Sequence, residues 1–337
     1  MWIDKEKANM ETSPGRWSVD ASSFQEPTLS LIESLANKVH REGPKLGLEP
    51  APPIYFFADL FVTLRQCREI AMLLCFINAD EGQTEGFDRT KGYALQALQL
   101  VRALIDRLYN VCSLLEEPTS RAPRFRASGY KKANLALEED KCRYGHLTDT
   151  DWPRHLAVQA KLLQASMDRD GINIRSPQCP ATWLTLGRYL QSAEGKSERG
   201  KFLNRFIQGF WRDYSGLSHG TFEGLFTWAF FSMPDVLPHD MRPELTDTAL
   251  RTIAVHLGRA FGVIACLLTE IQAYFHFEDD ATNIDDRLHR VWNALVVIPE
   301  VREMFNARYR DLMEQKGIRP KLDLSKLRES RSSTALS

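Results

Sequence analysis

Helical periodicity is the sequence feature that most constrains the fold of this chain. Apolar side chains recur three or four residues apart in long stretches, and no run of useful length alternates apolar and polar residues as a half-buried strand does. No internal repeat is present. The sequence therefore predicts an all-α protein with one compact multi-helix domain over residues 26–317. A flexible arm at 1–25 and a disordered polar, basic tail at 318–337 are expected to flank it.

Helix start and stop signals place the predicted helices. Ser30 and Glu33 form a capping-box pattern, which predicts a helix from Ser30 to about His40. The other predicted helices are 54–79, 88–117, 151–167, 181–191, 197–220, 243–275, 284–297 and 300–315. The segment between Thr119 and Arg143 is basic, and residues 121–132 within it are predicted to form a loop. A hinge is expected near 118–129 or 168–180.

Charge and cysteine usage narrow the class of protein. The 337 residues carry a formal net charge of −1, so no global basic field favours nucleic acid, and any basic patch must be local. Six cysteines without a CxxC pair favour buried thiols in a reducing cytosol. The first 25 residues are polar, unlike a signal peptide, and the most apolar runs are too short to cross a bilayer. We therefore expect a cytoplasmic protein without a membrane partner.

Several site types are excluded by their missing motifs. No P-loop, GxGxxG or GxSxG pattern occurs, which removes common NTPases, dinucleotide enzymes and serine hydrolases. The histidines show no HExxH-like spacing, and the acidic residues at 278–286 lack the ligand order of an EF-hand. We expect neither a metal site nor a cofactor.

The segment 197–220 is predicted to be one helix with two contrasting faces, with Ser197 as its N-cap and Gly220 after its end. The polar stripe consists of Lys201, Arg205, Gln208, Arg212, Ser215 and His219. The apolar stripe consists of Leu203, Phe206, Ile207, Phe210, Tyr214 and Leu217. Arg212 and His219 lie seven residues apart, so they are nearly eclipsed about two turns apart and able to flank one small anion.

Arginine and histidine together supply the chemistry for metal-independent RNA cleavage. Arg212 presents a planar fork of donors suited to phosphate, and His219 can exchange a proton near neutral pH. One group removes the 2′-hydroxyl proton while the other stabilises charge on the phosphorane. Ser218 is small and leaves room for a backbone or ligand to approach closely. The Tyr214 side chain either places its hydroxyl at the rim of the site or packs in the core.

The Arg212–Asp213 pair followed by His219 resembles the Arg-(Asn/His/Asp)-x4–6-His motif of the HEPN superfamily. Many HEPN proteins are all-helical, metal-independent ribonucleases of toxin–antitoxin and phage-defence systems, and many act as dimers with facing motif helices. The resemblance implies that Arg212 and His219 are catalytic and that Asp213 fills the polar position after the arginine. It also implies a homodimer, an RNA substrate and a regulatory or antitoxin protein as partner.

A second resemblance extends over roughly residues 90–230. Tyr214, Leu217, Ser218 and His219 resemble the Tyr-x-x-Leu-Ser…His signature of an uncharacterised bacterial helical family. Members of that family carry an earlier Arg-x3-Asp/Glu helix, which Arg102 and Asp106 match here. Asp106 either forms an i,i+4 salt bridge with Arg102 or orients Arg212 or His219.

Two functional hypotheses remain open at this point. In the first, the protein is a HEPN-like endoribonuclease, with Lys201 and Arg205 guiding the RNA backbone and Arg102 near the site. Arg124 and Arg126, with Phe125 and Tyr130 between and beside them, form either an RNA platform or a solvated loop. In the second hypothesis, the protein is a non-catalytic helical sensor or scaffold that binds a nucleotide, RNA or a partner protein.

Overall fold

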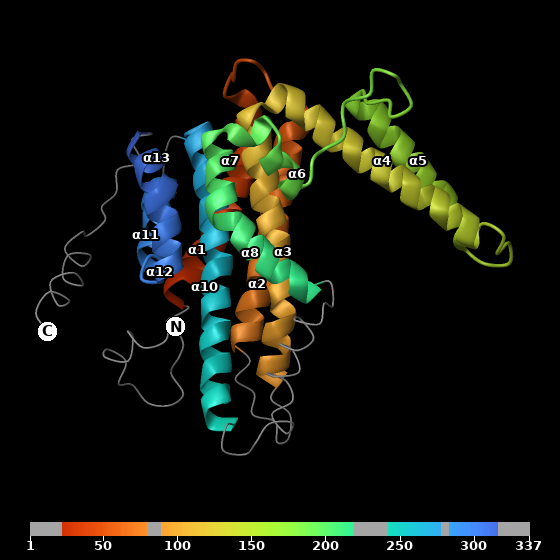
Figure 1. Cartoon of the computed structure of the whole chain (residues 1–337). Helices are drawn as coiled ribbons and strands as arrows, with labels where there is room; N and C mark the ends of the chain where they lie inside the picture. Colours follow the sequence, from red (N-terminus) through yellow and green to blue (C-terminus); the bar gives the residue numbers. More distant parts are fainter. Residues whose placement is uncertain (1–21, 80–88, 219–241, 278–282, 316–337) are drawn as a thin grey trace, which may run out of the picture.

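The computed structural model describes residues 22–79, 89–218, 242–277 and 283–315. Every regular element within these ranges is a helix and none is a strand, which confirms the predicted all-α class. Figure 1 shows the long helices α2, α3 and α10 running side by side, while α4 and α5 project from one end of this bundle.

Helix α10, Arg242–Phe275, lies at the centre of the bundle. Every residue from 260 to 273 is buried, as expected for a helix that is covered on all sides. Helix α3, Arg89–Glu116, packs along it, and α2, Ile54–Ala79, packs beside α3. The structure gives α2 the predicted bounds, and α3 ends one residue before the predicted Glu117 because Pro118 begins the next helix.

The C-terminal helices cover another side of α10. They are α11, Ile284–Leu295, and the continuous run of α12, Pro299–Met304, the π-helical turn η6, Phe305–Tyr309, and α13, Arg310–Gln315. Asn283 caps α11 by accepting a hydrogen bond from the Asp286 amide at 3.0 Å. A Cβ atom added to Gly258 of α10 would lie 2.4 Å from a methyl carbon of Ile298, so a glycine is needed for this close approach.

The predicted loop at 121–132 is wrong, because this segment lies within the long helix α4, Pro118–Tyr144. Pro118 occupies the first turn, where its missing N–H has no partner to lose. Helix α5, Trp152–Asp170, returns along α4, and Tyr144 and Trp152 stack at the tip with ring centroids 4.4 Å apart. We call α4 and α5 the arm (Figure 1). Of the two places where a hinge is expected, 118–129 is continuously helical.

Two other predicted helix starts are wrong. Helix α1, Ser22–Arg41, begins before the expected capping box, because Phe24, Thr28, Leu31 and Leu35 extend its buried stripe toward the N-terminus. Helix α6, Leu186–Gln191, begins later than predicted. The preceding residues are held in a non-helical conformation by Trp183, which donates its backbone N–H to Ser128 and its ring N–H to Asn110.

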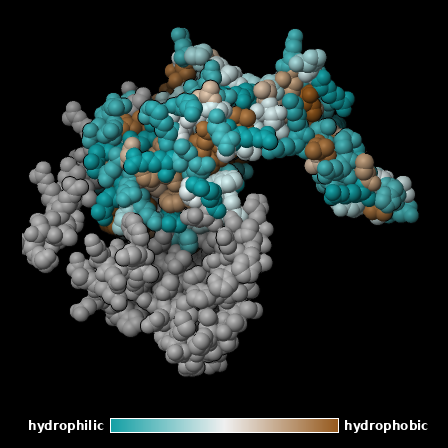
Figure 2. Space-filling model, viewed as in Figure 1, coloured by the Kyte–Doolittle hydropathy of each residue, from teal (hydrophilic) through white to brown (hydrophobic). Residues whose placement is uncertain are grey.

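The surface of the described residues is largely hydrophilic on the side seen in Figure 2. Exposed apolar side chains include Leu135, Val158 and Leu162, all of which lie on the arm. Within the described ranges, no helix combines the length and the apolar character required to cross a bilayer.

Candidate functional site

The segment that carries the predicted site is a continuous helix with a π-helical turn in its middle. Ser197 is the N-cap, as predicted, and accepts a hydrogen bond from the Gly200 amide at 3.0 Å. Helix α7, Glu198–Phe202, leads into the π turn η3, Leu203–Ile207, and this turn into α8, Gln208–Ser218. The predicted end at Gly220 lies outside the described residues.

The π turn explains why the predicted polar stripe does not stay on one face. A π turn adds one residue to the helix, so later residues are rotated relative to an uninterrupted α-helix. Lys201, Arg205 and Arg212 are exposed, whereas Ser215 is buried and faces the core together with Tyr214. The prediction that Ser215 shares one face with Lys201, Arg205 and Arg212 is therefore wrong.

Arg102 of α3 anchors the buried face of α8. Its Nε donates to the Ser215 hydroxyl at 2.9 Å, and its guanidinium lies 4.3 Å from the centre of the Trp211 ring. The other side of the guanidinium pairs with Asp106, which confirms the i,i+4 salt bridge. Trp211 was not singled out from the sequence, although its place one turn before Ser215 is the signal that would have suggested it.

Tyr214 makes a second anchor, between α8 and α10. Its ring is fully buried, and its hydroxyl lies 2.7 Å from Nδ1 of His256. Burial and the neighbouring Arg259 lower the pKa of His256 to about 4, so the imidazole is neutral at pH 7. Of the two positions considered for Tyr214, the structure shows the core one.

Most of the other predicted cationic site residues have a carboxylate partner, and Arg212 does not have one among the described residues. It is exposed on α8, next to the Trp211–Arg102 contact, and no carboxylate within the described residues pairs with it. The Asp213 and Ser218 side chains and the whole of His219 lie outside the described part of the chain, so the Arg212–His219 juxtaposition stays a prediction.

No protein-family model, curated protein or solved structure matches this chain.

Arg124 and Arg126 lie on α4 and are engaged inside the fold. Arg124 pairs with Glu194 at 2.7 Å. Arg126 holds Asp59 through two nitrogens, at 2.9 and 2.7 Å, and reaches Asp170 at 3.0 Å. Both guanidiniums therefore already have anionic partners, and a role for them on RNA stays a prediction.

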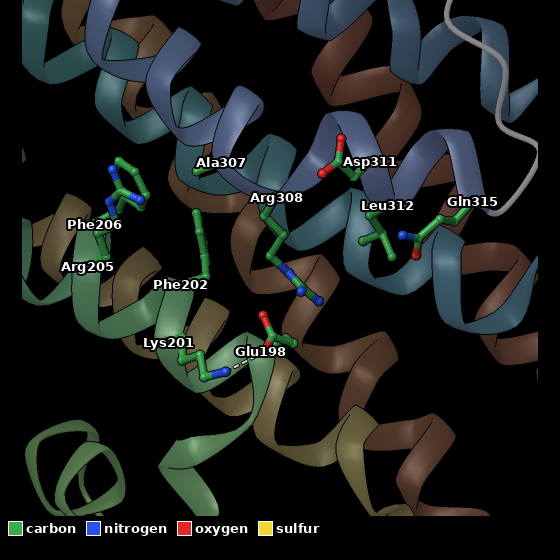
Figure 3. Close-up of a pocket in the computed structure, with 10 residues that line it drawn as sticks. All are labelled: Glu198, Lys201, Phe202, Arg205, Phe206, Ala307, Arg308, Asp311, Leu312 and Gln315. Carbon is green, nitrogen blue, oxygen red and sulfur yellow. Dashed lines mark hydrogen bonds and ion pairs between the residues drawn. The ribbon is translucent and has the colours of Figure 1, made fainter.

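Lys201 and Arg205 are exposed at the edge of a groove between α7–η3 and η6–α13. Lys201 pairs with Glu198 at 2.6 Å, whereas the Arg205 guanidinium lies 5.0 Å from the centre of the Phe206 ring and has no carboxylate partner in the described ranges. Figure 3 shows the residues of this groove.

Asp106 does not reach toward the C-terminal end of α8. Because Ser197 bonds to Glu116 while Ser215 bonds to Arg102, α7–α8 runs antiparallel to α3. Asp106 therefore lies one turn of α3 farther from the end of α8 than Arg102 does. This position suits a residue that orients Arg102.

Among the described residues, no group of three or more His, Cys, Asp or Glu side chains is arranged to hold a metal ion.

Proposed function

We propose that this protein is a HEPN-like, metal-independent endoribonuclease whose site lies at the C-terminal end of α8. The observation that carries the proposal is the exposed, carboxylate-free guanidinium of Arg212 on a helix fixed by two internal anchors. A guanidinium without a carboxylate partner is suited to bind an anion, and the anchored helix fixes the backbone from which it extends.

The proposed reaction follows from the two motif residues. Arg212 binds the scissile phosphate, and His219 takes the proton from the 2′-hydroxyl. The 2′-oxygen then bonds to phosphorus while the bond to the 5′-oxygen breaks, and the 5′-oxygen takes up the proton that His219 holds. The products are a 2′,3′-cyclic phosphate and a 5′-hydroxyl. Arg102, held by Asp106, keeps the helix in place through Ser215.

Assembly and location belong to the same proposal. The protein acts in the cytoplasm as a homodimer in which the two copies of α8 face each other, and a regulatory protein controls its activity. Lys201 and Arg205 contact the RNA backbone on the approach to the site, since both are exposed on the same helix.

The test is an RNA cleavage assay with 5′-labelled RNA in EDTA. We expect cleavage by the full chain and at least a hundredfold loss, by the order of magnitude of removed transition-state donors, in His219→Ala and Arg212→Ala. Arg212→Lys keeps the charge but loses the fork, and is expected to lose most activity. Arg290→Ala removes an exposed arginine of α11 and is expected to cleave as the natural chain does.

The alternative is a non-catalytic module that binds RNA, a nucleotide or a protein through the same face. The open guanidinium of Arg212 favours binding of an anion in both cases. Binding of RNA without cleavage, lost in Arg212→Ala, would support the module. Equal cleavage by all variants would indicate a contaminating nuclease and would overturn the proposal that this protein is an endoribonuclease.

A further inference from the structure

The outer face of α5 carries a regular stripe of exposed residues. Of the 19 residues in this helix, only Leu156 and Met167 are buried. Helix α5 packs on α4 within an arm that projects from the bundle (Figure 1), so its opposite face is open. On that face, residues spaced alternately four and three apart form what we call the outer stripe, and all of them are exposed: Asp151, His155, Val158, Leu162, Ala165 and Arg169.

The centre of the outer stripe is apolar. Val158 is 50% exposed and Leu162 is 62% exposed, which leaves two large apolar side chains in contact with water. In Figure 2, hydrophobic residues are visible among hydrophilic ones on the arm. A single exposed apolar residue is ordinary on a protein surface. A spacing that alternates between four and three residues, however, is the pattern by which one helix packs along another, and it favours a helix as the partner.

The two ends of the outer stripe carry opposite charges. Asp151 directly precedes α5 with helical backbone angles, and its carboxylate has no cationic partner among the described residues. Arg169, near the other end, is 67% exposed and binds Asp170 through Nε at 3.0 Å, which leaves its two Nη nitrogens facing solvent. A helix face with an acid at one end and a base at the other is complementary to a second copy that runs antiparallel to it.

One antiparallel register matches every position of the outer stripe. In this register a two-fold axis passes level with Ala160, and the axis makes each contact twice. Lys161 lies beside the axis in both copies, and its long stem allows the ammonium group to reach water. The facing residues of the two copies are Val158 with Leu162, His155 with Ala165, and Asp151 with Arg169.

The direction of α5 keeps the two bundles apart in such a pair. Helix α5 begins at the tip of the arm, where Trp152 stacks on Tyr144. It ends near the bundle, where Asp170 binds Arg126 of α4 and this guanidinium also binds Asp59 of α2. In an antiparallel pair, each bundle therefore lies beyond the tip of the other arm, so the arms can meet without a collision of the bundles.

We propose that the outer stripe of α5 is the contact surface for a second copy of this chain, paired antiparallel about Ala160. The contact buries the apolar centre and joins the charged ends of the two helices. Helix α5 belongs to the arm and α8 to the bundle, so this contact is separate from the facing α8 helices of the proposed function. A single helix pair is a small interface, so the arm pair is expected to dissociate on dilution.

The test is sedimentation velocity of the full chain over a series of dilutions. We expect the natural chain to associate as its concentration rises. Leu162→Glu should raise the dissociation constant about tenfold or more, because it places a carboxylate against Val158 of the second copy. Leu162 is exposed, so this variant is expected to fold.

Leu135→Glu is the matched control. Leu135 is also a leucine of the arm and is also 62% exposed. It lies on α4, two residues from the buried Leu137, and therefore on the other side of that helix. This variant should associate as the natural chain does.

The register is tested by cross-linking. His155 and Ala165 lie about 15 Å apart along one α5, too far for a disulfide within one copy, but they face each other across the pair. A chain with both His155→Cys and Ala165→Cys should form a disulfide-linked dimer when it is oxidised with copper phenanthroline. His155→Cys alone should give no more dimer than the natural chain, whose exposed Cys142 sets the background.

Three outcomes would overturn the proposal: a natural chain that stays monomeric at every concentration, equal association of the natural chain and Leu162→Glu, or equal weakening by Leu135→Glu. A double-cysteine chain that gives only the background amount of dimer would overturn the register. Both measurements are made without RNA, so their failure leaves the proposed nuclease untouched.

Discussion

His256 is a histidine whose ring nitrogen is held by a tyrosine hydroxyl. Burial comes first among the causes that lower its pKa from 6.5 to about 4, Arg259 adds to it, and Glu300 acts in the opposite direction. The imidazole therefore remains neutral in the folded protein at a pH where it is charged in the unfolded chain. Tyr214 and His256 form a neutral polar contact that fixes α8 on α10.

The pH dependence of stability follows from this shift. Between pH 6.5 and about 4, the unfolded chain binds the His256 proton and the folded protein does not, so stability present above pH 6.5 is lost as the pH falls. The contribution is on the order of 3 kcal/mol. We expect the free energy of unfolding, measured with urea, to fall less steeply over this range in His256→Gln. Parallel curves for the two proteins would contradict the buried, neutral imidazole.

At the scale of elements, Ser197 joins two helices through one hydroxyl. The oxygen accepts from the Gly200 amide and so caps α7, and the hydroxyl donates to Glu116 at the end of α3. Glu116 also receives Arg121 of α4 at 2.5 Å and Tyr189 of α6 at 3.1 Å. The ends of four helices therefore meet at one carboxylate, and this junction sets where α7 begins.

Removal of the Ser197 hydroxyl should weaken this junction. Ser197→Ala deletes a helix cap and leaves an oxygen of Glu116 without that donor, which predicts a loss of about 2 kcal/mol in the free energy of unfolding. Ser120→Ala removes an exposed hydroxyl near the start of α4 and should change stability by less than about 0.5 kcal/mol. Urea denaturation measures the free energy of unfolding of both variants. Equal losses in the two variants would contradict the role of Ser197 in joining α7 to Glu116.

At the scale of the whole molecule, the arm is joined to the bundle by a buried ionic contact. Arg126 of α4 binds Asp59 of α2 and Asp170 of α5, and Tyr130 also donates to Asp170. Burial would by itself raise the pKa of Asp170, but Tyr130, Arg169 and Arg126 more than offset it and lower this pKa. Burial raises the pKa of Asp59 to about 6, even beside Arg126. One guanidinium between two carboxylates thus joins α5, α4 and α2, in addition to the contacts of Arg121 with Glu116 and of Arg124 with Glu194.

Loss of this guanidinium should loosen the arm selectively. Arg126→Met leaves the buried Asp59 carboxylate without its cation and leaves Asp170 with only Arg169 and Tyr130, at a cost of about 3–5 kcal/mol. We expect faster hydrogen exchange in α5 peptides and unchanged exchange in α10 peptides, measured by mass spectrometry. Arg154→Met, on the exposed side of α5, is the control and should exchange as the natural chain does. Uniform acceleration in the arm and bundle would mean that the arm is not a separate unit of stability.

Several features could be predicted because they depend on neighbours in sequence. The bounds of α2, the end of α3 before Pro118 and the cap at Ser197 follow from helical period, from the missing N–H of proline and from a hydroxyl that accepts from the amide three residues on. The i,i+4 pair of Arg102 with Asp106 is local in the same sense. For α4, local signals failed, because prolines and cations suggest a loop until their distant partners are known.

The sequence by itself determined the all-α class, most helix bounds and the exposed position of Arg212, since these depend on periodicity along one chain. Only the tertiary structure decided what the charged residues touch. Glu270 meets Arg199 and Arg308, Ser215 meets Arg102, and Arg126 meets Asp59, all across large separations in sequence. The physical reason is that buried charges must be paired, and packing, which no local pattern encodes, selects the partner.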